Sequence, residues 1–369
     1  MTDSRLEPIY RALDAHNLDA AAIVPGSNFK RLFAIDFHLM ERPLVILIPR
    51  NSDPVAIVPR LEMGSFDSLD FQGPVFSWPD EEGYDAAFAS AADCLPELQA
   101  AQNFGLEAQR MRVFEQMALQ KVFPNAIFRD SHAEISEIRL IKTSSEIDNL
   151  KKAIQISEAA LEATLQQVEV GQTEKQIEAI LLKELFANGA DGLAFDPIVA
   201  AGENSAQPHA SARHDYQIKE GDALMFDFGA SWNGYNADIT RTFFIKQVSE
   251  HDRAFYETVL SANERGKLVS RAGTSAHEVD DQVQKVLENS QFAQFRRHKT
   301  GHGLGLDVHE APQIMRGNRT PLQTGMVFTV EPGLYRQGEC GVRIEDDVVV
   351  TDTGIECLTS FPRDLRLVG

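Results

Sequence analysis

The sequence has little of what several protein classes require. Only three of its 369 residues are cysteine, without paired spacing, which argues against a disulfide framework and favours a reducing compartment. No basic tract offsets the net charge of −20, so nucleic acid and anionic membrane surfaces are disfavoured as partners. The longest apolar run, about residues 44–49, is too short to span a membrane, and the N-terminus has no apolar signal region. We therefore expect a cytoplasmic protein.

The order of the expected elements divides the chain into two domains. Residues 1–131 alternate short apolar runs with helical segments, which is typical of an α/β domain. A helical connector over 132–142 leads to a larger domain over 143–369, where capping boxes at Thr143 and Thr173 begin two helices. The order of two helices followed by strands occurs twice, in blocks of about a hundred residues each. This repetition suggests a duplication with pseudo-two-fold symmetry.

An Asn-Gly pair at 233–234, flanked by apolar stretches, predicts a β-hairpin because both residue types tolerate the positive φ of a tight turn. In that register Thr240 lies opposite Asp227, and Asp238 is a diagonal neighbour of Asp227 on the same face. Two carboxylates would then meet inside an apolar sheet, where desolvation is costly. An exposed edge hairpin and an aspartate paired with an arginine remain as alternatives for this stretch alone.

Three more polar residues lie in apolar or glycine-rich surroundings. His302 stands in Thr-Gly-His-Gly-Leu-Gly, Glu331 follows an apolar strand in Val-Glu-Pro-Gly, and Glu345 interrupts the apolar run 342–350. The alternating glycines are not typical of a phosphate loop, because the Walker lysine and the strand-then-helix context are missing. They are better explained as allowing backbone to pack closely around the imidazole.

Together these residues supply four carboxylates and one imidazole. A bound divalent cation would offset the repulsion between negative charges that are clustered in an apolar interior. The set is large enough for two ions about 3.5–4 Å apart with bridging carboxylates. Its oxygen-rich, thiolate-free chemistry favours Mn²⁺, with Co²⁺ or Zn²⁺ as possible substitutes.

The five residues and their contexts resemble the metal ligands of the pita-bread metallopeptidases in order, type and spacing. They are most similar to the branch of Xaa-Pro aminopeptidase (aminopeptidase P) and Xaa-Pro dipeptidase (prolidase). The resemblance runs from about residue 138 to the end, and the first domain resembles the creatinase/prolidase N-terminal domain more loosely. It implies an α/β N-terminal domain, an α+β pita-bread catalytic domain with a curved, mainly antiparallel sheet, and a homodimer.

The same resemblance assigns a place to each ligand. Asp227 is expected to chelate one metal ion, and His302 and Glu331 are expected to bind the other. Asp238 and Glu345 are expected to bridge the two ions.

The resemblance also implies a role for each of the residues around the metals. Glu331 is expected to be the general base and proton shuttle. His309 is expected to stabilise the developing oxyanion or to assist the leaving nitrogen. His209 is expected to contact the substrate beyond the bond, and Arg343 to support Asp227.

The implied reaction is hydrolysis, by metal-activated water, of the first bond of a small peptide with proline in second position. In many prolidases an arginine four residues after the second histidine grips the carboxylate of the dipeptide, but here Gln313 stands at that position. This departure favours an aminopeptidase P-like preference for longer peptides, with a prolidase as the alternative. Arg316 or Arg319 could reach the carboxylate instead.

Three other interpretations compete with an Xaa-Pro peptidase. Methionine aminopeptidases share the catalytic fold, but the additional domain of about 130 residues argues against them. Creatinase-type hydrolases share both domains but lack the complete metal set, which is intact here. A catalytically silent peptide-binding module on the same scaffold usually loses ligands, and none of the five is lost.

Overall fold

The structure, a computed structural model, describes residues 4–369. The chain divides between Arg139 and Leu140 into two compact units, here called unit 1 and unit 2. The segment 132–142 spans this division. No helix within residues 4–369 is long and apolar enough to cross a membrane.

Unit 1 is an α/β domain built on a six-stranded mixed sheet with the order β4-β3-β2-β1-β5-β6. The pairs β3–β4, β1–β5 and β5–β6 are parallel, and the pairs β1–β2 and β2–β3 are antiparallel. The strands are β1 (Ala20–Ile23), β2 (Val45–Pro49), β3 (Val55–Pro59), β4 (Val75–Trp78), β5 (Phe104–Leu106) and β6 (Phe128–Asp130).

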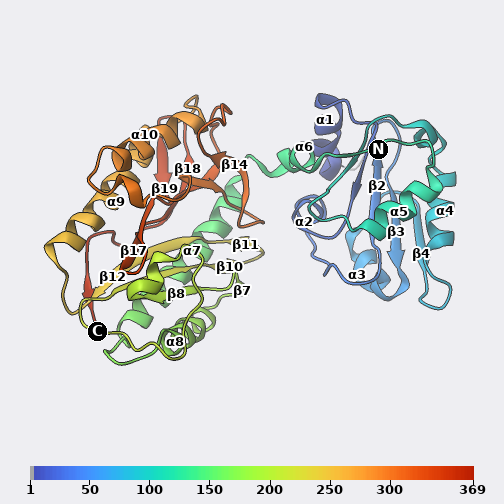
Figure 1. The fold of residues 1–369 in the computed structure, drawn as a ribbon. Helices are drawn as coiled ribbons and strands as arrows, with labels where there is room; N and C mark the ends of the chain where they lie inside the picture. The colour runs from blue at the N-terminus through green and yellow to red at the C-terminus, as the bar shows by residue number, and fades with distance from the viewer. Residues whose placement is uncertain (1–3) are drawn as a thin grey trace. The chain divides into compact units, whose positions relative to one another are not determined.

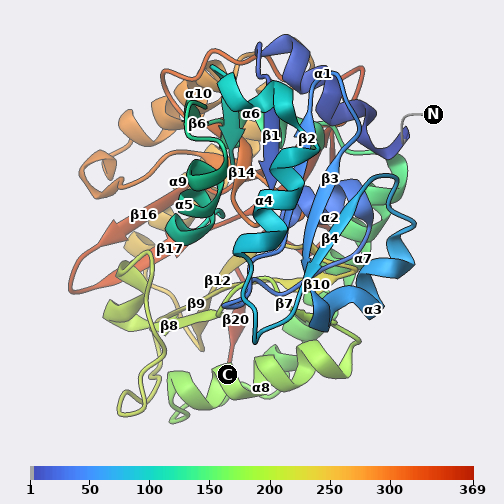
Figure 2. The same cartoon turned by 90° about the vertical axis from the view of Figure 1, so that its right-hand side faces the viewer.

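Helices cover both faces of this sheet, because alternate strand residues point to opposite sides and both sides are apolar. Ala20 and Ala22 belong to one core, whereas Ala21 and Ile23 belong to the other. The first core is covered by α4 (Asp85–Asp93) and α5 (Val113–Val122), which lie in front of the strands in Figure 2. The second core is covered by α1 (Glu7–Ala15), α2 (Ser27–Phe33), α3 (Met63–Phe66) and α6 (His132–Ser136).

Unit 2 consists of two halves with the same order of elements, two helices followed by strands (Figure 1). The first half contains α7 (Ser144–Leu165), α8 (Glu174–Ala187), β7 (Gly192–Leu193), β8 (Ile198–Ala201), β9 (Ala223–Phe228), β10 (Ala230–Trp232), β11 (Tyr235–Asn236) and β12 (Ile239–Ile245). The second half contains α9 (Glu250–Val269), α10 (Ala276–Glu288), β13 (Gly301–Gly303), β14 (Glu310–Ile314), β15 (Val327–Val330), β16 (Gly333–Arg336), β17 (Cys340–Arg343), β18 (Asp346–Val350), β19 (Ile355–Cys357) and β20 (Leu367–Val368).

The strand order confirms the predicted pseudo-two-fold repetition. In the first half β8, β9 and β12 are neighbours in an antiparallel sheet, and in the second half β13, β15 and β18 are neighbours in the same way. The pairing of β12 with β20 is parallel. The apolar run 342–350 is not one strand, because Ile344 and Glu345 separate β17 from β18.

The Asn-Gly turn sets the register of the first half as predicted. Asn233 and Gly234 have φ angles of 51° and 81°, and the strands on either side of them pair directly. Further from the turn, where β9 pairs with β12, Thr240 lies opposite Asp227. Because side chains alternate along a strand, a slip of one residue would move the carboxylate of Asp227 to the other face of the sheet.

A buried carboxylate in unit 1 is held by neutral groups. The Glu107 side chain accepts hydrogen bonds from the Val24 amide at 3.0 Å and from the Asn28 side chain at 2.8 Å. Arg139 Nε donates at 2.7 Å to Oδ1 of the same Asn28 side chain. Burial therefore raises the pKa of Glu107 to about 7.

This pKa predicts how the stability of unit 1 depends on pH. A carboxyl that is more easily protonated when folded contributes stability below pH 4.5, and that stability is lost as pH rises through about 7. Relative to Glu107→Gln, the wild type should lose up to about 3 kcal/mol of unfolding free energy between pH 4.5 and pH 8. Because Trp78 and Trp232 are the two tryptophans, fluorescence-monitored urea unfolding in a Trp232→Phe background reports on unit 1. The exposed Glu82→Gln is the matched control, and an equal pH dependence in all three proteins would contradict the assignment.

Candidate metal centre

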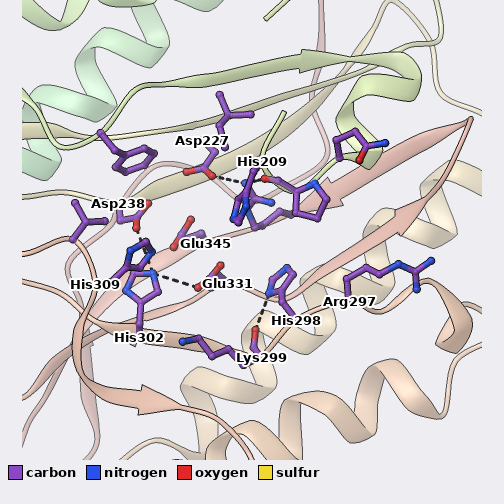
Figure 3. A pocket seen from close by; sticks show the side chains of 16 residues that line it. His209, Asp227, Asp238, Arg297, His298, Lys299, His302, His309, Glu331 and Glu345 are labelled. Carbon is purple, nitrogen blue, oxygen red and sulfur yellow. Dashed lines mark hydrogen bonds and ion pairs between the residues drawn. The ribbon is translucent and has the colours of Figure 1, made fainter. Parts of the chain in front are cut away.

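The strands of unit 2 bring the predicted site residues to one cavity of about 670 Å³. Figure 3 shows their side chains pointing toward one another from strands of both halves. The cavity is lined by Asp227, Asp238, His302, Glu331 and Glu345, and also by His209, His309 and Arg343.

The two halves contribute carboxylates from corresponding positions. Asp227 lies near the end of β9 and Asp238 directly precedes β12. In the second half Glu331 directly follows β15 and Glu345 directly precedes β18. In the corresponding sets β8-β9-β12 and β13-β15-β18, each half thus supplies one carboxylate from the end of the middle strand and one from the start of the last strand. His302 on β13 completes the group of predicted ligands.

Glycines next to His302 allow two neighbouring backbones to approach it, as expected from the sequence. A Cβ atom at Gly301 would lie 2.0 Å from the carbonyl oxygen of Thr329. A Cβ atom at Gly303 would lie 2.0 Å from the carbonyl oxygen of Ala311. Any larger residue at these positions would push the strands around the imidazole apart.

The imidazole of His302 presents an unprotonated nitrogen to the carboxylates. Burial lowers its pKa to about 3, so the ring is neutral. Its Nδ1 lies 3.1 Å from the carbonyl oxygen of Gly303 and donates to it, which places the proton there. The Nε2 lone pair then faces Asp238 Oδ2 at 3.6 Å and Glu331 Oε1 at 3.4 Å. Three potential ligand atoms, one nitrogen and two oxygens, therefore converge.

Burial raises the pKa of three of the carboxyl groups, those of Asp238, Glu331 and Glu345. Asp238 and Glu345 are 4% and 2% exposed, and burial, followed by the charges of neighbouring carboxylates, raises the pKa of both well above the ordinary value. Burial also raises the pKa of Glu331 to about 8. Asp238, His302 and Glu345 each offer a ligand atom, and these atoms lie within 4.8 Å of one another. This group could hold a metal ion.

Arg343 contacts side chains on one side of the cluster. Its guanidinium forms an ion pair with Asp227 Oδ2 and donates at 3.0 Å to the Thr240 hydroxyl. That hydroxyl donates to Glu345 Oε2 at 2.6 Å. Within residues 4–369, the other oxygen of Asp227 is buried and has no hydrogen-bond partner. Such an orphaned acceptor and the converging lone pairs fit a hard divalent cation with oxygen and imidazole ligands.

The two additional histidines also line the cavity. The ring of His309 packs edge-on against that of His302, with centroids 4.2 Å apart. Burial, followed by the positive charge of Lys299, lowers the pKa of His309. His209 lies on the segment that follows β8, next to Asp227 in Figure 3. Both rings are therefore able to contact a ligand in the cavity.

Sequence reasoning missed three cavity residues that precede β13, namely Arg297, His298 and Lys299. His298 Nε2 lies 2.7 Å from the hydroxyl of Tyr335, which also accepts from Arg343 at 2.6 Å. Burial lowers the pKa of His298 to about 4, so it serves as a neutral acceptor. The signal that could have found these residues is the basic run 296–299 in a chain of net charge −20, just before the Gly-His-Gly segment.

A fifth buried carboxylate next to the cluster was also missed. Asp347 is fully buried and its Oδ2 accepts from the backbone amide of Asp238 at 3.1 Å. Burial raises its pKa well above the ordinary value. Its spacing of two residues from Glu345 is the available signal, because alternate strand residues share a face.

The two arginines that the sequence offered for binding a substrate carboxylate do not line the cavity. Arg316 forms ion pairs with Glu288 and Asp281, and neither Arg316 nor Arg319 is among the residues that line the cavity. Gln313 accepts a hydrogen bond from the ammonium of Lys299. The positive charge next to Gln313 is therefore that of Lys299.

Relatives share both units of the chain. A 231-residue stretch is 38% identical to a Xaa-Pro dipeptidase of Pyrococcus furiosus, covering 63% of this chain and 66% of the relative. A Xaa-Pro dipeptidase structure from Bacillus anthracis superposes with a TM-score of 0.89 at 31% identity, covering 99% of both chains. An X-Pro aminopeptidase structure from Thermotoga maritima gives 0.80 at 33% identity, covering 97% of this chain and 100% of that one.

Two family descriptions match the chain in succession. Residues 5–141 match the creatinase/prolidase N-terminal domain. Residues 148–352, which contain the five predicted ligands, match metallopeptidase family M24. Together with the solved structures, these matches confirm the predicted α/β N-terminal domain and pita-bread catalytic domain. The chain belongs to metallopeptidase family M24.

Proposed function

We propose that this metallopeptidase is an exopeptidase that hydrolyses the bond between the first residue of a peptide and a following proline. The convergence of His302 Nε2 with the oxygens of Asp238 and Glu331 carries the proposal. The names of relatives, which include Xaa-Pro dipeptidase and X-Pro aminopeptidase, supply the substrate class. A silent binding module is disfavoured because a binding role alone gives no reason to bury this many carboxylates together.

We assign the cofactor to the five predicted ligands. Asp227, Asp238, His302, Glu331 and Glu345 would hold two divalent ions, with Asp238 and Glu345 shared between them. Their oxygen-rich chemistry favours Mn²⁺ over Zn²⁺ or Co²⁺. When bound, such ions lower the pKa of a water molecule and polarise a carbonyl group.

The surrounding side chains then move protons and hold the substrate. Glu331 lines the cavity with the other predicted ligands, and we infer that its carboxylate accepts a proton and later delivers it to the leaving nitrogen. His309 would donate to the developing oxyanion or assist that nitrogen, which in proline carries no hydrogen within the peptide bond. His209 would contact the residue beyond the bond, and Arg343 holds the side chain of Asp227 in place through their ion pair.

Two preferences for substrate length remain as candidates. Glutamine at position 313 favours an aminopeptidase P-like preference for longer peptides, and one relative is named X-Pro aminopeptidase. Other relatives are named Xaa-Pro dipeptidase, which favours dipeptides. The cytoplasmic location and the homodimeric state stay predictions.

The first test is metal content and specificity. Metal analysis of the protein purified without chelator should find about two divalent ions per chain. With Mn²⁺ added it should hydrolyse Ala-Pro or Ala-Pro-Ala and leave Ala-Ala nearly untouched. A metal-free protein that gains no such activity with Mn²⁺ would refute the proposal, and the two proline substrates separate a dipeptidase from an aminopeptidase.

Replacing a shared ligand tests the assignment of the cluster. Asp238→Asn should lower kcat by about a thousandfold or more, because the amide removes one bridging charge while keeping the shape of the side chain. Far-ultraviolet circular dichroism and the thermal midpoint of the metal-free protein should change little. The exposed Asp191→Asn, on the same half of unit 2, is the control. Near-wild-type turnover by Asp238→Asn would contradict the bridging role.

Metal binding should release protons at neutral pH. The raised pKa values of Asp238, Glu345 and Glu331 mean that the metal-free cluster holds protons at pH 7, and cations displace them. Mn²⁺ affinity should therefore increase from pH 6 to pH 8. Calorimetric titrations in buffers of different ionisation enthalpy measure the release, which we expect at about one proton or more per chain. Glu331→Gln should reduce the number of protons released. A binding heat that is independent of the buffer would contradict proton release.

A further inference from the structure

Positively charged side chains contribute to the wall of the cavity. Three of them line the cavity, namely Arg297, Lys299 and Arg343. Arg343 is already committed to Asp227 and Tyr335. Across residues 4–369 neither Arg297 nor Lys299 forms an ion pair, since Arg297 donates to backbone carbonyls and Lys299 donates to the amide oxygen of Gln313.

Lys299 is the cation that lies near the reacting side of the cavity. It lines the same cavity as His309 and Glu331. In Figure 3 its side chain extends beneath His302, whereas Arg297 points away from the carboxylates. Lys299 is thus placed beside the group that we assign to the oxyanion or the leaving nitrogen.

Gln313 holds this ammonium without neutralising it. The amide nitrogen of Gln313 donates to the carbonyl oxygen of Glu310 at 2.9 Å, so its amide oxygen is turned toward Lys299. A neutral amide is a weaker partner for an ammonium than a carboxylate is. An incoming anion therefore gains a charge-assisted hydrogen bond from a cation that is already oriented.

We propose that Lys299 binds the C-terminal carboxylate of a dipeptide substrate and so determines a preference for Xaa-Pro dipeptides. This inference rests on the function proposed above, because the carboxylate in question is that of the leaving proline. The favoured activity is then that of a dipeptidase, with the anchoring charge at 299.

Chain geometry restricts which substrates can use this anchor. In a dipeptide the carboxyl carbon is two bonds from the proline nitrogen, along N–Cα and Cα–C bonds of about 1.5 Å each. A third residue moves the terminal carboxylate about 3.3–3.6 Å further and replaces it with a neutral amide carbonyl. A lysine beside His309 therefore meets the charge of a dipeptide but only a dipole of a longer peptide.

The experiment compares two substrates that differ in one charge. Steady-state kinetics of the Mn²⁺-loaded full chain are measured with Ala-Pro and with Ala-Pro-NH₂, which has the same size without the carboxylate. The wild type should prefer Ala-Pro by about 10- to 100-fold in kcat/KM. Lys299→Met should raise KM for Ala-Pro by about the same factor, with little change in kcat and none for the amide. Lys299→Arg should restore most of the preference.

Arg297→Met is the matched control, because it removes the same charge from the same cavity wall. It should leave the ratio between the two substrates unchanged. The proposal is overturned if Lys299→Met lowers both activities equally or neither, or if Arg297→Met shows the selective loss.

A second measurement separates this inference from the proposed function. If the Mn²⁺-loaded wild type hydrolyses no proline peptide, the proposed reaction fails, and calorimetric binding of L-proline and L-prolinamide then tests the anchor alone. Tighter binding of L-proline that Lys299→Met abolishes would support the carboxylate site without the reaction. Equal binding of both ligands, or no effect of Lys299→Met, would overturn it.

Discussion

The cost of burying negative charge is the constraint on which unit 2 depends. Four carboxylates lie around His302, and burial removes most of the water that would solvate Asp238 and Glu345. In the part of the chain that the structure describes, the guanidinium of Arg343 pairs with Asp227, and the hydroxyl of Thr240 donates to Glu345. These groups are too few to neutralise the cluster. The remaining negative charge must therefore be neutralised by protons or by cations. The raised pKa values show the first solution, and metal binding is the second.

Local rules were enough to predict part of this arrangement. The Asn-Gly turn fixed the pairing of Asp227 with Thr240, because turn chemistry and strand alternation act over a few residues. Capping boxes at Thr143 and Thr173 likewise mark the starts of α7 and α8. The candidate ligands could be named because each stands in a short, recognisable sequence context.

Other features depend on residues that are distant in sequence. Arg343 and Asp227 are 116 positions apart, and their ion pair exists only because two separate sheets meet. The contact between Lys299 and Gln313 joins two segments on either side of the Gly-His-Gly strand. The break at Ile344 and Glu345 was also missed, because an apolar run gives no local signal of a bend. In unit 1 the short α2, α3 and β6 carry too few periodic residues to be recognised.

The origin of the ligands in both halves of unit 2 has a mechanical consequence. Asp227 and Asp238 belong to the first half, whereas His302, Glu331 and Glu345 belong to the second. Two cations held by these five ligands would act as a cross-link between two segments that repeat the same topology. Loading the site would thus join the halves into one cooperative unfolding unit, and its loss would let each half open on its own.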